Sequence, residues 1–384
     1  MPDRPVRILF LNHVSQMSGA EASLLDLIQS LDPSRFTPSV ALPGPGPLAA
    51  ALAGRDIRTS FLPLRRLRKS LNPLLAVQSA ASLVRVAAEL RALCRRDRID
   101  VLHANSNTAF LYAALCPTPP SVRKVWHSRD LAEFGRGGRW LYARADRVIA
   151  ISEAVRRHLR RYATDESKLL TIPNGIDVAH FVPQGQRAAT RTALGLAADT
   201  LVIGMAGQFV PGKRHDLFLD MAQRLGSALP EARFLVIGGD LFNDQPAYTR
   251  ELERRVRTPE LAGKVLLTGP RADIRPLYEA LDVLVHPADR EPFGRVVAEA
   301  MALGKPVVAV NACGPAEIIR DGTDGLLVPA NSADALAAAV LRLAQDNELA
   351  RRLGVAAAAR VRDAFSLSLL GERMERLYSG LLQT

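Results

Sequence analysis

The sequence predicts an α/β protein with two doubly wound parallel sheets, each covered by helices. Its 384 residues suit two domains at the usual size of about 150 residues each. Short apolar runs alternate with helical patterns along the whole chain, which is typical of βαβ units. Runs such as LVIGMA (201–206) and FLVIG (234–238) are almost continuously apolar, as expected for strands that are buried on both faces.

In the first half of the chain, apolar runs predict strands at 7–11, 39–42, 101–104, 122–127 and 148–151. Helical periodicity predicts helices at 20–31, 74–97, 106–115, 138–145 and 153–162. The segment GPGPLA at 44–49 resembles a dinucleotide-binding loop in its glycine spacing. Its two prolines remove backbone donors that a pyrophosphate would need, so we interpret it as a turn.

In the second half, apolar runs predict strands at 201–206, 234–237, 264–268, 283–286, 307–310 and 326–328, each followed by a helix or a short turn. The polar stretch PQGQRAATRTALG (183–195) separates the two series. We therefore expect a Rossmann-like N-terminal domain at 1–182, a Rossmann-like C-terminal domain at 183–364, and a final helix at 365–384 that returns to the N-terminal domain. Ligands are expected at the carboxyl ends of the strands, in a cleft between the facing domains.

Composition excludes several classes of protein. Hydrophobic residues make up 48% and charged residues 23% of the chain, a globular balance that a disordered or fibrous chain does not have. No apolar run approaches the ~18 residues that span a bilayer. The three cysteines, at 94, 116 and 313, form no C-x-x-C, which argues against a disulfide framework or a zinc site. We expect a cytoplasmic protein.

The net charge of +11 lies entirely in the first half. Residues 1–182 hold 26 Lys and Arg against 15 Asp and Glu, whereas residues 183–384 hold 24 of each. Such asymmetry concerns partners more than fold, and it predicts that the first half meets something anionic.

The segment Gly207–Arg214 follows a predicted strand and matches the phosphate-binding P-loop motif G-x-x-x-x-G-K-[ST] at every position except the last. Its last position is Arg214, which offers no hydroxyl for Mg²⁺, and Pro211 removes a backbone donor. The sequence also contains no D-x-D, H-E-x-x-H or G-x-S-x-G motif. A P-loop NTPase, a metal site and a serine nucleophile are therefore disfavoured.

The most informative stretch runs from Glu291 to Glu299 and reads EPFGRVVAE. A predicted strand ends just before it, and a helix is expected to start near Gly294. The backbone N–H groups of Phe293 to Val296 then form a helix N-terminus, which is a ready anion site. A glutamate on each side of a phosphate pocket can bind a diol, one on a sugar and one on a ribose.

With these residues in place, the chain resembles the retaining glycosyltransferases of family 4, which have the two-domain GT-B fold. The EPFG…E block carries most of the resemblance. Weaker matches are spread over nearly the whole chain: Gly19-Ala-Glu21, VLHA (101–104), VWHSRD (125–130), Ile151-Ser-Glu153, IPNGID (172–177) and Lys213 after Gly207.

The resemblance implies roles for individual residues. Glu291 would contact the donor sugar hydroxyls and Glu299 the ribose, while Phe293 and Gly294 would offer N–H groups to the sugar and diphosphate. Lys213 would neutralise the leaving diphosphate. Gly19 would let the first helix approach the diphosphate, and His127 would lie over the sugar ring. The catalytic residues expected are thus His127, Lys213 and Glu291.

One position departs from the family pattern. The family often has an arginine directly after Gly207, but this chain has Gln208. Glutamine can still donate a hydrogen bond, whereas a charge-assisted bond is about twice as strong. Arg214 and Arg271 are candidates for the missing cation. Selection of the nucleotide base is expected near Thr268–Ile274, with Ile274 among the donor-binding residues.

The resemblance implies transfer of a glycosyl unit from a nucleoside-diphosphate sugar, with UDP-sugars favoured over GDP-sugars, to an acceptor hydroxyl. We expect the acceptor to be a glycan or a lipid-linked glycan. No further cofactor and no metal are expected. A sugar-nucleotide 2-epimerase of similar architecture is an alternative, as is a transferase that acts on a soluble small molecule. A nucleic-acid-binding role is disfavoured because only 5% of residues are aromatic and no recognised nucleic-acid module is present.

A basic stretch lies in the first half. Residues 55–100 hold eleven basic and four acidic groups, and Arg65, Arg66, Arg68 and Lys69 precede a predicted helix that Asn72-Pro73 would start. One interpretation is a solvated amphipathic surface helix. The other is a patch that docks on anionic lipid, where each cation contributes about 1 kcal/mol. The second interpretation predicts a peripheral membrane enzyme of cell-surface polysaccharide or glycolipid assembly.

Overall fold

The computed structural model describes residues 4–65 and 73–383 of the chain. It divides them into two compact units. Unit 1 comprises the chain up to Gly175 together with the segment from Leu367 onward, and unit 2 comprises Ile176–Ser366. Each unit contains one parallel sheet, so the predicted fold class of two parallel α/β sheets is confirmed. Arg66, Arg68, Lys69 and Asn72 lie outside the described residues.

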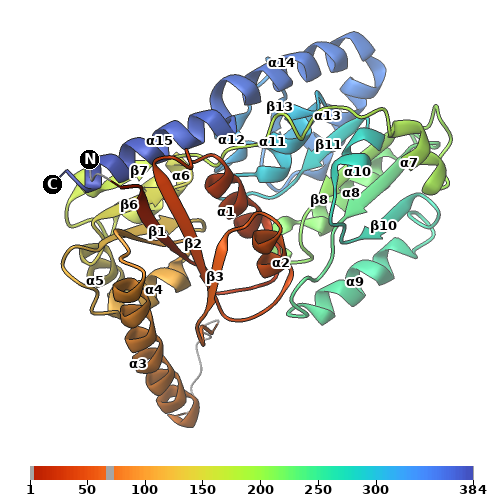
Figure 1. Cartoon of the computed structure of the whole chain (residues 1–384). Coiled ribbons are helices and arrows are strands. Elements are labelled where there is room, and N and C mark those ends of the chain that lie inside the picture. The colour runs from red at the N-terminus through yellow and green to blue at the C-terminus, as the bar shows by residue number, and fades with distance from the viewer. Residues whose placement is uncertain (1–3, 66–72, 384) are drawn as a thin grey trace. The chain divides into compact units, whose positions relative to one another are not determined.

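Unit 1 is built on a seven-stranded sheet in the order β3-β2-β1-β4-β5-β6-β7 (Figure 1). Its strands are β1 (Val6–Leu11), β2 (Phe36–Leu42), β3 (Arg58–Phe61), β4 (Val101–Ala104), β5 (Arg123–Ser128), β6 (Arg147–Ala150) and β7 (Leu169–Thr171). All neighbours pair in parallel, with Val6 opposite Phe36 and Ile8 opposite Val101. The order reverses direction between β1 and β4, which makes this pair the switch point of the sheet.

The helices of unit 1 follow the strands in the alternation that the sequence predicts. They are α1 (Gly19–Gln29), α2 (Pro47–Ala53), α3 (Pro73–Arg96), α4 (Asn107–Leu115), α5 (Gly137–Ala143), α6 (Glu153–Arg160) and α15 (Leu367–Leu381), with a 3₁₀ turn at Glu166–Lys168. Helix α15 supplies Leu370, Met374, Leu377 and Tyr378 to the same core as Phe10 and Phe36. Unit 1 therefore completes its core with a segment that follows unit 2 in the sequence.

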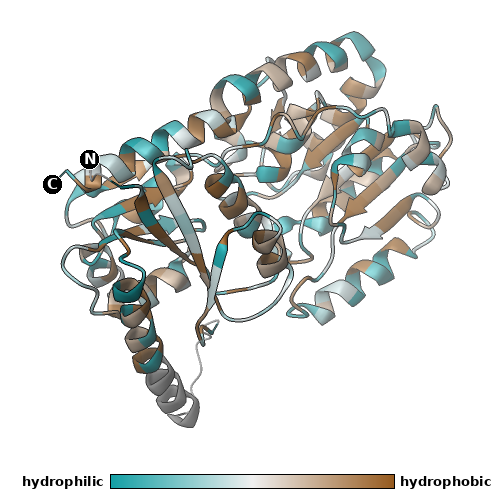
Figure 2. Ribbon diagram, in the orientation of Figure 1, coloured by the Kyte–Doolittle hydropathy of each residue, from teal (hydrophilic) through white to brown (hydrophobic). Residues whose placement is uncertain are grey.

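Unit 2 repeats the arrangement with a six-stranded sheet in the order β10-β9-β8-β11-β12-β13. Its strands are β8 (Val202–Ala206), β9 (Arg233–Ile237), β10 (Val265–Gly269), β11 (Val283–His286), β12 (Val307–Val310) and β13 (Leu326–Val328). The strands are mostly apolar (Figure 2), and each of β8, β11 and β12 is buried along its whole length. The switch point of this sheet lies between β8 and β11.

The helices of unit 2 are α7 (Arg187–Ala193), α8 (His215–Leu225), α9 (Pro246–Val256), α10 (Arg275–Ala280), α11 (Arg295–Ala302), α12 (Pro315–Ile318), α13 (Ala333–Gln345) and α14 (Asn347–Phe365), with a 3₁₀ turn at Pro211–Lys213. Leucines and valines of α8 and α13 pack with the strands in one core, for example Leu217, Leu336 and Val340. This packing fixes the strand ends from which the loops of unit 2 begin.

One sequence expectation is wrong, and a helix lies in a stretch where none was expected. The segment at 44–49 is not a plain turn, because α2 begins inside it at Pro47. Proline suits the first turn of a helix, where its missing N–H would have no partner anyway, and the alanine-rich residues that follow favour a helix. The polar stretch at 183–195 likewise contains helix α7, which buries Arg191 at 1% exposure. Because this helix buries a charged residue, a search for regularly spaced apolar residues does not detect it.

Candidate functional site

In both units, polar side chains gather after the strands that flank the switch point. In unit 1 these residues are Asn12 after β1 and Asn105 after β4. In unit 2 they lie in the loop after β8, which leads to Lys213, and in the loop after β11, which contains Glu291. Open α/β sheets bind ligands at this place.

The centre of the unit 2 cluster is the ion pair between the Nζ of Lys213 and the Oε2 of Glu291. The same oxygen lies 3.4 Å from the Nε2 of His286, the last residue of β11. Burial alone would raise the pKa of Glu291, but the charge of Lys213 and the contact with His286 outweigh it and hold the pKa well below its usual range. Glu291 is therefore a carboxylate that is buried and fully ionised, in direct contact with a cation.

The loop that carries Lys213 starts at a close approach between two strand ends. Gly207, directly after β8, donates its N–H to the carbonyl of Ile237 at 2.9 Å. Gly238 follows Ile237 with a φ of +136°, and a Cβ at this position would lie 1.9 Å from the Gly207 carbonyl oxygen. Only glycine fits there. The backbone thus turns sharply and places Lys213 within reach of Glu291.

The loop that carries Glu291 is fixed against the turn before α12. The N–H of Gly314 donates to the carbonyl of Glu291 at 2.9 Å, and a Cβ on Gly314 would lie 2.2 Å from the Phe293 carbonyl oxygen. Gly294 is the N-cap of α11 with a φ of +96°, a conformation that glycine tolerates best. Phe293 is 4% exposed. The N-terminus of α11 is therefore held next to the Lys213–Glu291 pair.

Glu299 lies inside α11 and is also paired. Its Oε1 accepts from the Nε of Arg295 at 2.6 Å, one helical turn earlier, and its Oε2 accepts from the hydroxyl of buried Tyr278 at 3.2 Å. Burial and the nearby carboxylate raise the pKa of Tyr278 well above its usual value. Tyr278 therefore remains a hydrogen-bond donor, and both oxygens of Glu299 have protein partners.

The other predicted donor-binding residues of unit 2 are less closely engaged with this pair. Gln208 is half-buried in the loop after β8. Arg214, in a left-handed conformation at φ 57°, pairs with Asp216 at 3.2 Å and donates to Asn331, so this candidate cation already has acceptors. Arg271 is exposed in the loop after β10, and Ile274 is the N-cap of α10. Val296 is the second residue of α11.

The predicted histidine of unit 1, His127, lies near the end of β5 and is 1% exposed. Its Nδ1 lies 3.1 Å from the Nε2 of His103 on β4, and the Nδ1 of His103 lies 2.8 Å from the hydroxyl of Tyr378 on α15. Burial and the nearby charge of Arg129 lower the pKa of both histidines well below the usual value. Both rings are neutral at pH 7.

A run of hydrogen bonds connects Arg129 to Glu21 across the switch point of unit 1. Arg129 donates from Nε to Asn105 at 2.9 Å, Asn105 donates to Asn12 at 3.0 Å, and Asn12 donates to Glu21 at 3.1 Å. Arg129 also donates to Asn174 at 2.7 Å. Every amide in this run accepts on one side and donates on the other, so the run leads from a cation to an anion.

The predicted Gly19 is the first residue of α1 and is exposed. No atom lies within 4 Å of the position that a Cβ would take there. Just before it, the hydroxyl of Ser18 donates to Glu21, which orients the start of α1. A ligand could approach the backbone of Gly19 without meeting a side chain.

Sequence reasoning missed Asn12, Asn105, Arg129 and Tyr378. Asn12 and Asn105 follow directly after predicted strands and Arg129 lies two residues after one, so a search for polar residues at the carboxyl ends of neighbouring strands would have found them. Tyr378 offers no such signal, because it is one of several regularly spaced residues on the buried face of α15.

The basic stretch is described only in part. Arg65 is exposed, and its backbone N–H donates to the Tyr112 hydroxyl at 3.0 Å. Val86, Leu90 and Leu93 of α3 are buried. On the exposed side, Arg85 pairs with Glu89. Within the described part of the chain, no helix is both long and apolar enough to cross a membrane.

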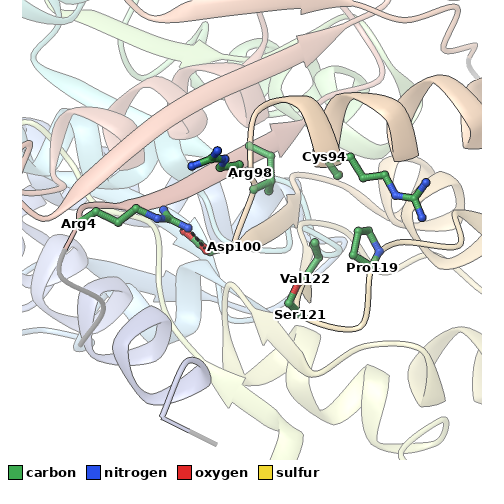
Figure 3. A pocket seen from close by; sticks show the side chains of 9 residues that line it. Arg4, Cys94, Arg98, Asp100, Pro119, Ser121 and Val122 are labelled. Atoms are coloured by element: carbon green, nitrogen blue, oxygen red, sulfur yellow. Dashed lines mark hydrogen bonds and ion pairs between the residues drawn. The ribbon is translucent and has the colours of Figure 1, made fainter.

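Figure 3 shows a hollow of unit 1 that is lined by Arg4, Cys94, Arg98, Asp100 and Val122, among other residues. Arg4 and Asp100 form an ion pair at 2.8 Å. The hollow lies where β1 and β4 begin, which is the edge of the sheet opposite to the switch-point residues. We assign it no role in the candidate site.

Among the described residues, no group of three or more His, Cys, Asp and Glu side chains is placed to hold a metal ion.

Comparison with known families covers both units. Residues 17–180 match the family described as Glycosyltransferase Family 4, and residues 186–360 match the family described as Glycosyl transferases group 1. Among curated proteins, a D-inositol 3-phosphate glycosyltransferase of Nocardia farcinica is 32% identical over 75% of this chain and 62% of its own length. Its counterpart in Kribbella flavida is 33% identical over 56% of this chain and 51% of its own length. The chain thus spans only about half to two thirds of these relatives.

Among solved structures, the Anabaena protein Alr3699/HepE in complex with UDP-glucose superposes with a TM-score of 0.85. It is 25% identical, and the match covers 97% of this chain and 99% of that protein. The likeness therefore extends over both units.

Proposed function

The chain belongs to the group 1 glycosyltransferases of family 4 and has the GT-B fold, and from this premise we propose that it transfers a sugar from a nucleoside-diphosphate sugar to an acceptor hydroxyl with retention of configuration. The observation that carries the proposal is the ion pair of half-buried Lys213 with buried Glu291, beside the N-terminus of α11. A cation and a helix N-terminus suit a diphosphate, and the carboxylate suits the hydroxyls of a sugar.

The chemistry separates a diphosphate from a sugar that becomes oxocarbenium-like. Catalysis then consists mainly of stabilising the negative charge that develops on the leaving group, which is the task of Lys213 and of the first N–H groups of α11, including that of Val296. Glu291 would hold sugar hydroxyls, and Glu299 would accept from the ribose. No carboxylate nucleophile is needed if the leaving phosphate takes the proton of the acceptor hydroxyl.

We propose a UDP-sugar as the donor, because the Anabaena relative that was solved in complex with UDP-glucose matches along nearly its whole length. Thermal unfolding against a panel of UDP- and GDP-sugars tests this choice, since a ligand at 100 times its Kd stabilises the folded state by ~2.7 kcal/mol. We expect the Tm to rise with at least one UDP-sugar and the rise to be lost in Lys213→Ala. A panel that leaves the Tm unchanged overturns the proposal.

The same panel separates transfer from epimerisation. An epimerase would turn the donor over in the absence of any acceptor, so the protein is incubated with the stabilising nucleotide sugar alone and the products are separated by chromatography. We expect slow hydrolysis at most. Appearance of the 2-epimer would replace the transferase proposal with the epimerase.

For the acceptor, we propose a glycan or lipid-linked glycan of the cell surface, with unit 1 docked on anionic lipid through Arg65, Arg66, Arg68 and Lys69. The support is the basic charge of residues 1–182. The ion pair of Arg85 with Glu89 removes one α3 cation from such a patch. The relatives in Kribbella flavida and Nocardia farcinica are instead named D-inositol 3-phosphate glycosyltransferases, which favours a soluble phosphorylated acceptor as the second candidate.

Co-sedimentation with vesicles distinguishes the two acceptor classes. We expect binding to vesicles that contain anionic lipid, weaker binding at higher salt, and loss of binding when Arg65, Arg66, Arg68 and Lys69 are neutralised together. The control removes the same charge from exposed positions of unit 2, at Arg250, Arg254, Arg351 and Arg352. Equal behaviour of both variants would leave the soluble acceptor as the better candidate, to be assayed with inositol phosphate.

A further inference from the structure

One ring nitrogen of His127 has hydrogen-bond partners among the described residues, and the other has none. Its Nδ1 lies 3.1 Å from His103 and 3.4 Å from the Nη2 of Arg129. Its Nε2 is buried and has no hydrogen-bond partner among the described residues. An unpaired buried polar atom is costly, so the free nitrogen suggests a place for a ligand. What this nitrogen offers to the ligand depends on which nitrogen carries the proton.

Arg129 decides the proton position from one side. A guanidinium has only donors, and Arg129 is oriented by its bonds to Asn105 at 2.9 Å and Asn174 at 2.7 Å. The atom that it approaches on His127 must therefore be an acceptor. A neutral imidazole with an accepting Nδ1 carries its proton on Nε2.

Tyr378 decides it independently from the other side. Tyr378 is 0% exposed. Its hydroxyl group has one hydrogen to donate, and its hydrogen-bond partner is the Nδ1 of His103 at 2.8 Å. If Tyr378 donates this hydrogen, His103 is protonated on Nε2 and donates in turn to the Nδ1 of His127. The reverse direction would leave the Tyr378 hydrogen without an acceptor and would set an N–H of Arg129 against an N–H of His127.

We propose that Tyr378, His103 and Arg129 are positioning residues that lock His127 in the Nε2–H tautomer, so that His127 presents a fixed neutral hydrogen-bond donor to an oxygen of the bound sugar. The choice of ligand rests on the proposed function, whereas the tautomer does not. The ring of His103 is itself held against Phe10, with centroids 4.9 Å apart. Because its Nε2 already carries a proton, His127 cannot take the proton of the acceptor hydroxyl there.

The tautomer is measured directly on the intact chain without substrate. Nitrogen-15 NMR of the histidine-labelled protein at neutral pH distinguishes a protonated from an unprotonated ring nitrogen. His127→Gln and His103→Gln assign the signals among the seven histidines. We expect both rings in the Nε2–H form, and an Nδ1–H form of His127 would overturn the inference.

Tyr378→Phe tests the positioning role, with Tyr142→Phe as a matched control. Tyr142 is also fully buried in unit 1, and its hydroxyl donates one hydrogen bond, to the carbonyl of Asp165 at 2.9 Å. Both variants lose a single buried hydrogen bond, so a purely structural role moves the Tm of both alike and the tautomer of neither. We expect only Tyr378→Phe to mix the tautomers of His103 and His127.

In the transferase assay, we expect Tyr378→Phe to lower kcat by about three- to tenfold, the scale of one lost hydrogen bond, with a smaller effect on KM. Tyr142→Phe should retain the kcat of the unsubstituted protein. Equal kcat values for the two variants would overturn the positioning role. If no nucleotide sugar is turned over, the proposed function fails, while the NMR result on the two tyrosine variants still decides the tautomer lock.

Discussion

The two units hold polar groups at their switch points in different ways. In unit 1 the cation Arg129 and the anion Glu21 are separated by the amides of Asn105 and Asn12, and His103 and His127 are neutral. In unit 2 the charges touch, as Lys213 with Glu291 and Arg295 with Glu299. Unit 1 therefore fixes the direction of hydrogen bonds, whereas unit 2 holds charges in pairs.

This difference separates two tasks. A cation and a carboxylate in direct contact can each exchange the other for a ligand group, and under the proposed function Lys213 would take a diphosphate and Glu291 would take hydroxyls. A directional run of neutral groups cannot be exchanged piece by piece, since reversing one bond disturbs its neighbours. We therefore expect substitutions in unit 2 to act through charge and substitutions in unit 1 to act through geometry.

The largest effect is expected for Lys213→Ala. Removing a group that stabilises leaving-group charge should lower kcat by roughly 10²-fold or more, as initial rates with the stabilising nucleotide sugar would show. Arg224→Ala is the control, because Arg224 forms an exposed ion pair with Asp334 in the same unit and exposed pairs contribute little. An unchanged kcat in Lys213→Ala would remove charge stabilisation from the description of unit 2.

The acid behaviour of Glu291 sharpens the comparison. Because its pKa lies well below the usual range in the folded protein, its ionised form stabilises the fold above the unfolded pKa of about 4.3, and that stabilisation is lost as the pH falls through the folded pKa. The Tm difference between the unsubstituted protein and Glu291→Gln should be largest near pH 7 and should shrink below about pH 4.3. A difference that stays constant down to pH 3 contradicts the pairing.

A third test compares one glycine from each unit. In Gly294→Ala an alanine has to adopt a φ of +96°, and its Cβ lies 3.2 Å from the side chain of Pro315. We expect this substitution to destabilise unit 2 by about 1–2 kcal/mol. Gly19→Ala meets open space at the start of a helix, so its Tm should not fall. If Gly19 lets a diphosphate approach, activity should drop in Gly19→Ala without loss of stability. Equal activity before and after this substitution would remove Gly19 from the site.

The smallest effect is expected for metal removal. If Lys213 and the N-terminus of α11 neutralise the diphosphate, EDTA should leave the transfer rate unchanged, as measured before and after addition of Mg²⁺. Complete loss of activity in EDTA, restored by Mg²⁺ or Mn²⁺, would mean that protein charges alone do not perform this task.

Much of the fold was predictable because parallel strands are buried on both faces. The strands at 283–286, 307–310 and 326–328 were predicted with the observed bounds, since their apolar runs end at polar or turn residues. Strands β3 and β7 were missed. The first is a short edge strand with exposed Arg58 and Phe61, and the second has only three residues, so neither shows the apolar run that a buried strand requires.

The candidate site was predictable where one local motif carries it. The block from Glu291 to Glu299 is such a motif, and the structure places its first glutamate against Lys213, 78 residues earlier. The run from Arg129 to Glu21 was not predictable, because its bonds join residues such as Asn12 and Asn105 that lie 93 positions apart. Their proximity follows from the order of the strands, which no single segment of sequence contains.

Helix α15 has a consequence for how the protein is made. Unit 1 lacks Met374, Leu377 and Tyr378 of its core until the ribosome has synthesised all of Ile176–Ser366. Unit 2 is continuous, so it can fold on the nascent chain while unit 1 is still incomplete, and domains generally do fold as units during synthesis. The second sheet in the sequence can therefore reach its native state before the first, and the closing of unit 1 around Tyr378 also completes the hydrogen bonds that orient His127.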